Sequence, residues 1–388
     1  LLIEAGGKDN YPWIHIPVGY FKTMHNPKTD WCYRTEPDAS MNNISIRYPR
    51  GKTLGGSSSI NGLLYIRGQN RDYDIWRQLG NTGWGWDDVL PYFIKAENQE
   101  RGKSEYLTDL IMEKTLLFLD DVNGPFFLNY SPYAVHTPIH PVDSLMYKYE
   151  KKSAYKGQKN PKYATMVENL DRNIGLMVEK LKKRKLFDNT FIIFTSDNGG
   201  YYGKITMQKP LRAGKGSYYE GGIRVPFFFM WKNKISPGKN TQTTISHLDI
   251  FPTLMHLKGD HSMENDLDGH SLLPLLTQNK FVEERSFFWH FPIYLQGYDI
   301  KDNENRDSLF RTRPGSVIRK GDWKLHYYFE DQGIELYNLK HDIGERNNLA
   351  EIEVDKRKEL ADELKAWWEK TDAPIPTAIN PLYAPRSN

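Results

Sequence analysis

The chain has 388 residues, of which 39% are hydrophobic and 26% charged, so it is long enough for two or three globular domains. Its formal net charge of +3 and its short apolar runs, such as 225–231, predict neither a nucleic-acid partner nor a membrane span. A single cysteine, Cys32, excludes an intrachain disulfide and a cysteine-rich metal site, and the sequence indicates no compartment.

The first predicted elements are a short buried strand and a glycine-dense loop. Residues 1–3 form the strand, which ends at Glu4 before a Gly-Gly turn. In a dinucleotide-binding unit, an acidic residue at this place accepts the ribose hydroxyls, although any buried strand that meets a turn looks alike. The loop at 51–68 allows its backbone to approach a phosphate or a flavin ring closely. The candidate cofactor contacts are Glu4, Gly55, Gly56, Ser57 and Asn61.

Four motifs in this part of the chain carry a resemblance to a known family. They are DWCYRTEPD (30–38), RYPRGKTLGGSSSINGLLYIRG (47–68), DYDIW (72–76) and GWGWDDVLPYFIKAE (83–97). Through them, residues 1–102 resemble the glucose–methanol–choline (GMC) family of flavin-dependent alcohol oxidoreductases. The resemblance implies a partial FAD-binding lobe, with Glu4 on the ribose and 53–61 along the flavin. The family's histidine base lies on a substrate domain that has no counterpart here, so we expect no oxidoreductase function. The glycine fingerprint that should hold the pyrophosphate is not among these residues, so we expect no stoichiometric FAD.

The second part of the chain alternates between helical and strand patterns. Apolar residues repeat at helical spacing in 106–119 and again in 161–181, where Pro161 suits the first turn. Buried strands are predicted at 126–128 and 191–194. Repeated strand–helix–strand units predict a mostly parallel sheet, with a functional site at the carboxyl ends of its strands.

Four polar residues follow these predicted strands. Asp197 and Asn198, in the turn after 191–194, offer oxygen ligands that suit calcium or magnesium. Lys215 lies between two glycines, where its ammonium can approach an anion, and His136 has the chemistry of an anion ligand or proton donor. Taken singly, each also fits a plain structural role, as an Asp-Asn-Gly turn, a solvated lysine or a hydrogen-bonded turn histidine.

The order and spacing of these residues match a known pattern. The motifs are PFFLNYSPYAVHTPI (125–139), NTFIIFTSDNGG (189–200), PLRAGKGSYYEGGIRVP (210–226), HLDIFPTL (247–254), DGHSLLPLL (268–276), FFWHFPIY (287–294) and the stretch 318–350. Through them, residues 103–378 resemble the carboxy-terminal two-thirds of a type I sulfatase of the alkaline-phosphatase-like superfamily. The resemblance implies that Asp197 and Asn198 bind calcium, while Lys215 and His136 contact the sulfate and assist departure of the alcohol.

The same resemblance implies two further features. His290 becomes a candidate contact for the sugar of a sulfated carbohydrate, because it lies in the motif at 287–294. A small carboxy-terminal subdomain is expected, with short strands in 317–338 and a helix at 354–370.

The residue that attacks sulfur in this family is a formylglycine, made from the first residue of a Cys/Ser-x-Pro-Ser-Arg motif that this sequence does not contain. Cys32 lies in Asp-Trp-Cys-Tyr-Arg, within the flavin-type segment. The family's other metal ligands form an Asp-Asp pair, but Asp120 and Asp121 fall at a predicted helix end, and Asp87 and Asp88 belong to the flavin-type segment. We therefore expect both the calcium site and the FAD site to be incomplete.

Together these patterns predict a chimera with an α/β fold. Residues 1–102 are expected to form a partial FAD-binding lobe, 103–310 a truncated, mostly parallel alkaline-phosphatase-like sheet, and 311–388 a small α+β subdomain. The expected function is that of a sulfatase, a sulfuric ester hydrolase for carbohydrate sulfates, without turnover in the chain as given. Two alternatives stay open: a fragment of an FAD-dependent alcohol or choline oxidoreductase, and a non-catalytic binder of sulfated sugars.

Overall fold

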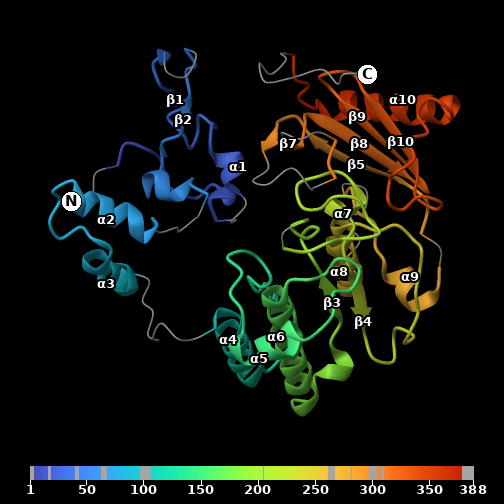
Figure 1. The fold of residues 1–388 in the computed structure, drawn as a ribbon, viewed down its shortest axis with the longest axis horizontal. Helices are drawn as coiled ribbons and strands as arrows, with labels where there is room; N and C mark the ends of the chain where they lie inside the picture. Colours follow the sequence, from blue (N-terminus) through green and yellow to red (C-terminus); the bar gives the residue numbers. More distant parts are fainter. Residues whose placement is uncertain are drawn as a thin grey trace. The chain divides into compact units, whose positions relative to one another are not determined.

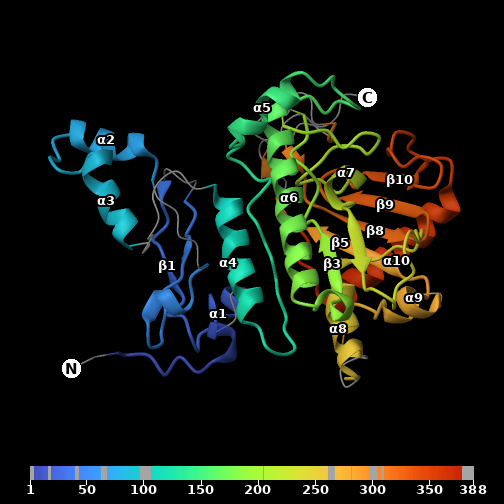
Figure 2. The same ribbon diagram turned by 90° about the horizontal axis from the view of Figure 1, so that it is seen from below.

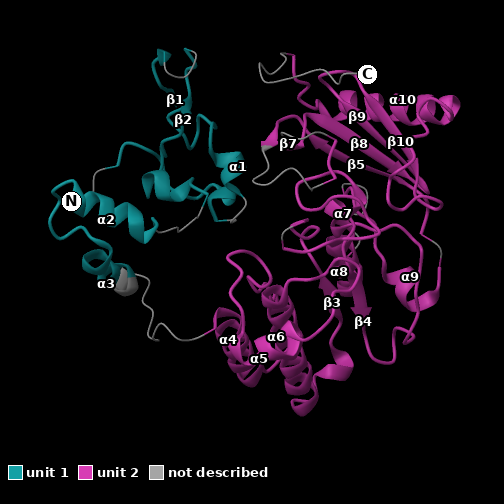
Figure 3. Cartoon of the chain, viewed as in Figure 1, with its two compact units in different colours: residues 1–104 teal, residues 105–388 magenta. Residues whose placement is uncertain are grey.

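The chain forms two compact units, residues 1–104 and 105–388, which we describe separately (Figure 3). The computed structural model describes residues 4–15, 19–39, 43–62, 68–96, 106–203, 205–260, 267–280, 282–296, 304–306 and 310–377. The strand expected at 1–3 lies outside these ranges. Within them, no helix combines the length and the apolar character needed to cross a membrane.

The amino-terminal unit is built from short elements. They are the 3-10 helices Pro12–His15 and Gly56–Ser59, the helices α1 (Tyr20–Thr23), α2 (Asn70–Gln78) and α3 (Trp86–Ala96), and the strands β1 (Tyr33–Arg34) and β2 (Arg47–Tyr48). The two strands pair antiparallel, with Tyr33 opposite Tyr48. Buried Asp30 holds the loops around them, because it accepts backbone N–H groups of His25, Cys32 and Arg50 at 2.7, 3.0 and 2.8 Å. Local polar contacts therefore organise much of this unit.

Three helices open the second unit and lie side by side (Figures 1 and 2). They are α4 (Leu107–Asp121), α5 (Asp143–Glu150) and α6 (Pro161–Lys183), so both helices predicted in this region are confirmed. Asn160 caps α6, because its side-chain oxygen accepts the backbone N–H of Tyr163 at 3.1 Å. Helices α4 and α6 are joined by Asp109, whose carboxylate accepts the side-chain amides of Asn169 and Asn173 at 3.0 and 2.7 Å.

The expected parallel sheet is not what the described residues form. The predicted strand at 191–194 is present as β3 (Ile192–Thr195), but it pairs antiparallel with β4 (Phe227–Met230). Residues 126–128, expected to be a strand, form no ladder, and Phe127 is 76% exposed. A strand needs a hydrogen-bonding neighbour, and among the described residues β3 has only β4. The prediction of a mostly parallel sheet was therefore wrong for this part of the chain.

A four-stranded antiparallel sheet forms the carboxy-terminal part. Its order is β10 (Ile334–Asn338), β9 (Trp323–Tyr328), β8 (Gly315–Lys320) and β5 (Ser286–Phe291). Helix α10 (Val354–Thr371) packs on it, and their shared core contains Ile318, Leu325, Leu336, Leu360 and Leu364 (Figure 1). The strands and the helix expected for this subdomain are confirmed. This sheet begins earlier in the chain than the boundary expected at residue 310, because strand β5 pairs with β8.

Shorter elements complete the described part of this unit. They are α7 (Glu220–Ile223), α8 (Ile250–Lys258), α9 (Leu273–Gln278), β6 (Leu295–Gln296), β7 (Phe310–Thr312) and the 3-10 helices Phe187–Asn189 and His247–Asp249. Strands β6 and β7 pair antiparallel. Among these elements α7 matters most for the site, because it ends the loop that carries Lys215.

Candidate functional site

Strand β3 delivers Asp197 and Asn198 to a tight turn. The turn is fixed by Gly199, whose backbone N–H donates to the carbonyl oxygen of Gly222 at 2.9 Å. A Cβ added to Gly199 would collide with the carbonyl oxygen of Gly221, so only glycine allows this approach. The turn after β3 therefore rests directly on helix α7.

The loop that carries Lys215 is attached to the same turn. The backbone N–H of Lys215 donates to the carbonyl oxygen of Gly200 at 2.9 Å. A Cβ added to Gly214 would collide with that same oxygen, and Gly216 has a φ of +85°. These glycines bring the backbone of Lys215 against the turn that carries Asp197 and Asn198.

The side chains of Lys215 and His136 lie together. The Nζ of Lys215 is 3.1 Å from the Nε2 of His136, and the Nδ1 of His136 is 2.7 Å from the carbonyl oxygen of Thr137. Since that carbonyl only accepts, Nδ1 carries the proton and Nε2 offers its lone pair to the ammonium. The residues come from separate segments, 79 positions apart in the chain, and both are accessible to solvent.

Asn198 offers one oxygen that suits a cation, but the ligand set is incomplete. Its Oδ1 is buried and has no hydrogen-bond partner, which costs free energy unless a donor or a cation satisfies it. Asp197 beside it is exposed. No group of three His, Cys, Asp or Glu residues in the described ranges is placed to hold a metal ion. Calcium takes six to eight oxygen ligands, so these residues fit it only in part.

Asp120, at the end of α4, has a structural role. Both carboxylate oxygens of Asp120 accept from the Nζ of Lys180, at 2.8 and 2.7 Å, and this hydrogen bond lowers the pKa of Asp120. Asp120 thus joins α4 to α6.

His290 is engaged inside the carboxy-terminal subdomain. Its Nδ1 lies 2.6 Å from the hydroxyl of Ser316, which in turn accepts the indole N–H of Trp368 at 2.9 Å. Its Nε2 lies 3.1 Å from the carbonyl oxygen of Pro374. Burial lowers the pKa of His290, and both ring nitrogens already have partners. The geometry therefore gives no support to the expected sugar contact. Strand β5 pairs with β8, which places the His290 ring beside Ser316, and both ring nitrogens are used in hydrogen bonds within the protein.

The glycine-dense loop of the first unit folds on itself. The Oγ of Ser57 accepts the backbone N–H of Gly51 at 3.3 Å, and Gly55 and Gly56 have φ angles of 88° and 56°. The carboxylate of Glu4 accepts the backbone N–H of Gly6 at 2.7 Å. Asn61 also makes an interaction within the protein. The residues described here form no strand–helix–strand unit around these groups, so an FAD-binding lobe is not shown.

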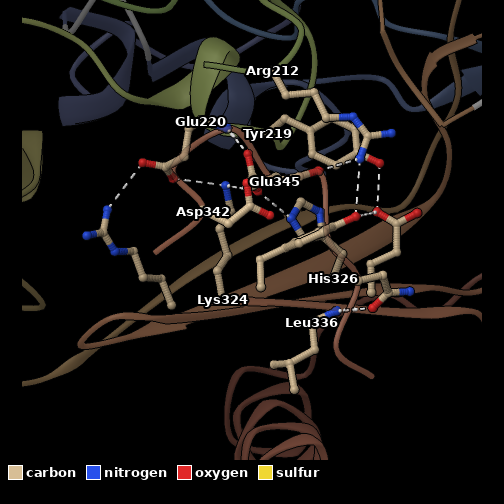
Figure 4. Close-up of polar contacts among 12 residues, drawn as sticks. Arg212, Tyr219, Glu220, Lys324, His326, Leu336, Asp342 and Glu345 are labelled. Carbon is tan, nitrogen blue, oxygen red and sulfur yellow. Dashed lines mark hydrogen bonds and ion pairs between the residues drawn. The ribbon is translucent and has the colours of Figure 1, made fainter. Parts of the chain in front are cut away.

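A buried ionic cluster, which the sequence analysis missed, joins helix α7 to strand β9 (Figure 4). The Nζ of Lys324 is 3.0 Å from carboxylate oxygens of both Glu220 and Glu345. Burial alone would raise the pKa of Glu345, but Lys324 and a hydrogen bond from His326 hold it at about 2. The YEGG sequence around Glu220 was the available signal, but nothing local marked Lys324 and Glu345, which lie 104 and 125 residues away.

Comparisons with known proteins give two different likenesses. The sulfatase family model matches residues 47–259, and the model for the carboxy-terminal part of N-sulphoglucosamine sulphohydrolase matches 214–373. A sulfatase of Formosa agariphila is 34% identical over 301 residues, covering 70% of this chain and 52% of its own length. The oxygen-dependent choline dehydrogenase of Rhizobium johnstonii is 46% identical over 103 residues, covering 26% of this chain and 19% of its own length.

A solved structure supports the fold of the larger part. Ps i-CgsB, whose structure contains k-i-k-neocarrahexaose, is 29% identical with a TM-score of 0.58, and the match covers 72% of this chain and 62% of that protein. The fold is thus an α/β sulfatase fold. The chain spans about half the length of the Formosa sulfatase. The match to the sulfatase family begins at residue 47, upstream of the boundary near 102 that the motifs predicted.

Proposed function

The chain belongs to the sulfatase family, and on this premise we propose that it binds the sulfate group of a sulfated carbohydrate through Lys215 and His136. The observation that carries the proposal is the 3.1 Å contact between the Nζ of Lys215 and the Nε2 of His136, beside the turn of Asp197 and Asn198. An accessible ammonium next to an imidazole is a suitable partner for an oxyanion.

The chemistry of the pair favours two contacts to one sulfate. An ammonium has three donors, so Lys215 keeps two N–H groups after it bonds His136. The contact with the Nε2 of His136 holds the ammonium in place, so its two remaining N–H groups can donate to two oxygens of one sulfate.

Asp197 and Asn198 are the residues that would hold a calcium ion, through a carboxylate and the unpartnered Oδ1 of Asn198. A bound calcium would add positive charge beside the sulfate. Because the described ligand set is partial, we assign the recognition of sulfate to Lys215 and His136 alone.

We further propose that the 388-residue chain binds sulfate esters without hydrolysing them. The Cys/Ser-x-Pro-Ser-Arg motif, from which the family's nucleophile is made, does not occur in its sequence. Without the nucleophile of a catalytic unit, only binding and electrostatic contributions to rate remain.

The test is a calorimetric titration of the purified chain with glucosamine 6-sulfate, with glucosamine as the unsulfated control. Lys215→Ala is expected to weaken binding about tenfold or more, because a hydrogen bond to a charged group contributes about 1.5–3 kcal/mol. Lys232→Ala removes the same charge from an exposed pair with Asp188 and should leave the affinity unchanged. Equal affinity for both sugars would refute sulfate recognition, and release of inorganic sulfate would refute the absence of turnover.

The likeness of one segment to choline dehydrogenase supports a second proposal, that the chain is a chimera whose first unit derives from a GMC oxidoreductase. We propose that this unit retains motifs of FAD recognition without holding the cofactor. The genomic sequence across residues 95–110 tests the chimera directly. If the chimera is real, a single read must run without interruption through the codons on both sides of the junction.

A further inference from the structure

The loop that carries Lys215 is held at both flanks by the carboxy-terminal sheet and its following turn. On one side, the guanidinium of Arg212 donates to the backbone carbonyl of Glu345 at 3.0 Å. On the other side, the hydroxyl of Tyr219 donates to the carboxylate of Glu335 on β10 at 2.7 Å. The segment between these two anchors contains Lys215, so its position depends on residues more than a hundred positions away.

The strongest of these attachments is made by helix α7. The backbone N–H of Glu220 donates to the carboxylate of Glu345 at 2.5 Å. Lys324 bridges the two glutamates, with its Nζ 3.0 Å from each, and the Nε2 of His326 lies 3.0 Å from the carboxylate of Glu345 (Figure 4). The side chains of Lys324 and Glu345 are fully buried, and that of Glu220 is 1% exposed.

Because these charges are buried, the cluster is stable only while Lys324 lies between Glu220 and Glu345. Two carboxylates out of water repel each other unless a cation lies between them, and the cation needs both oxygens to replace its hydration shell. Arg319 and Arg224 approach the outer oxygen of Glu220 at 3.5 and 3.2 Å, and so complete its compensation. A displacement of α7 from β9 would break several of these contacts together.

Backbone hydrogen bonds and close glycine contacts connect this cluster to the loop of Lys215. Directly after Glu220, the backbone N–H of Gly221 donates to the carbonyl oxygen of Arg212 at 2.9 Å, which closes the loop at its base. A Cβ added to Gly221 would collide with the carbonyl oxygen of Ala213. The next residue, Gly222, accepts from the turn after β3. A shift of α7 therefore moves the base of the Lys215 loop and the turn of Asp197 together.

We propose that Lys324 and Glu345 are positioning residues, which set the place of Lys215 through helix α7 without touching the ligand. The identity of the ligand rests on the proposed function, whereas the effect on the loop does not. The carboxy-terminal sheet would thus contribute to anion binding by positioning the loop of Lys215.

The experiment measures loop order and sulfate binding on the same variants of the full chain. Loop order is read from hydrogen exchange of the Lys215 amide, which is bonded to Gly200, with the amides of β3 and β4 as an internal reference. Binding is read from calorimetric titration with inorganic sulfate. Lys324→Met is expected to speed exchange of the Lys215 amide about tenfold or more and to raise the sulfate dissociation constant about tenfold. Lys320→Met, on the neighbouring strand β8, is the matched control and should change neither readout.

The double variant Lys324→Met/Glu345→Gln separates positioning from stability. It removes the unpaired charge that Lys324→Met leaves buried, so its melting temperature should recover. The Lys215 amide should still exchange fast and the sulfate affinity should stay low, because the bridge to α7 is absent. Wild-type exchange in the folded double variant, or fast exchange with wild-type affinity, would overturn the proposal. If the wild-type chain does not bind sulfate, the proposed function fails and the exchange result alone decides the positioning role.

Discussion

The amino-terminal unit and the carboxy-terminal sheet are held together in different ways. In residues 4–96, the buried hydrophobic side chains of the described positions are Ile60 and Tyr73, whereas Leu79 and Tyr92 are 75% and 74% exposed. In the sheet and α10, a whole set of aliphatic side chains is fully buried: Val317, Ile318, Leu325, Leu336, Leu360 and Leu364. The sheet and α10 therefore share an apolar core, whereas the first unit relies more on polar contacts such as those of Asp30.

The largest expected effect tests this contrast directly. Leu336→Ala removes a fully buried side chain and should lower the free energy of unfolding by about 2–5 kcal/mol. Leu79→Ala removes an exposed side chain of the first unit and should change it by less than about 0.5 kcal/mol. Denaturant unfolding of both variants checks the prediction. A large effect of Leu79→Ala would show that the first unit has a core of its own.

Acid should act on the buried cluster of the second unit. The pKa of Glu345 is lowered from 4.5 to about 2, so its stabilisation is fully present above pH 4.5 and is lost as the pH falls towards 2. The loss should amount to about 3 kcal/mol. Unfolding measured at several pH values should show this slope, and Glu345→Gln should flatten it while lowering stability at neutral pH. An unchanged slope in Glu345→Gln would remove the cluster as its cause.

A smaller effect is expected at the turn after β3. Calcium at tenfold excess over its dissociation constant should stabilise the chain by about 1 kcal/mol, through Asp197 and the unpartnered Oδ1 of Asn198. Thermal melting with and without calcium measures this shift. Asn198→Asp should enlarge it, because it adds a charged oxygen, and Asn198→Leu should abolish it. A calcium shift that survives Asn198→Leu would place the ion elsewhere.

The smallest expected effect concerns the first unit and FAD. The purified chain should carry no stoichiometric flavin, and added FAD should leave its melting temperature unchanged, because several donors of the loop at 51–62 are already bonded within the first unit. An absorbance spectrum with one flavin per chain would contradict this. Such a result would also show that the first unit has an apolar core like that of the carboxy-terminal sheet, with the bound cofactor in place of buried side chains.

Local patterns predicted much of the second unit. Helix α6 begins where Asn160 and Pro161 supply a cap and a suitable first residue, and both features can be found from neighbouring positions alone. Strands β8 to β10 and helix α10 were expected from the resemblance of the motifs in 287–350 to a known family. The proximity of Lys215 and His136 was expected from motif order, and the structure places them 3.1 Å apart. Their roles in sulfate binding stay predictions.

From the sequence came helices α4, α6 and α10, strand β3, the short strands in 317–338 and the polar residues grouped near Lys215. The tertiary structure decided which strands pair, as in the antiparallel ladder of β3 and β4. It also placed the His290 ring where both of its nitrogens form hydrogen bonds within the protein. It also decided that Lys324 is buried between Glu220 and Glu345. Periodicity reports on neighbours within a few residues, whereas a strand's partner and a buried ion's compensation come from residues far along the chain.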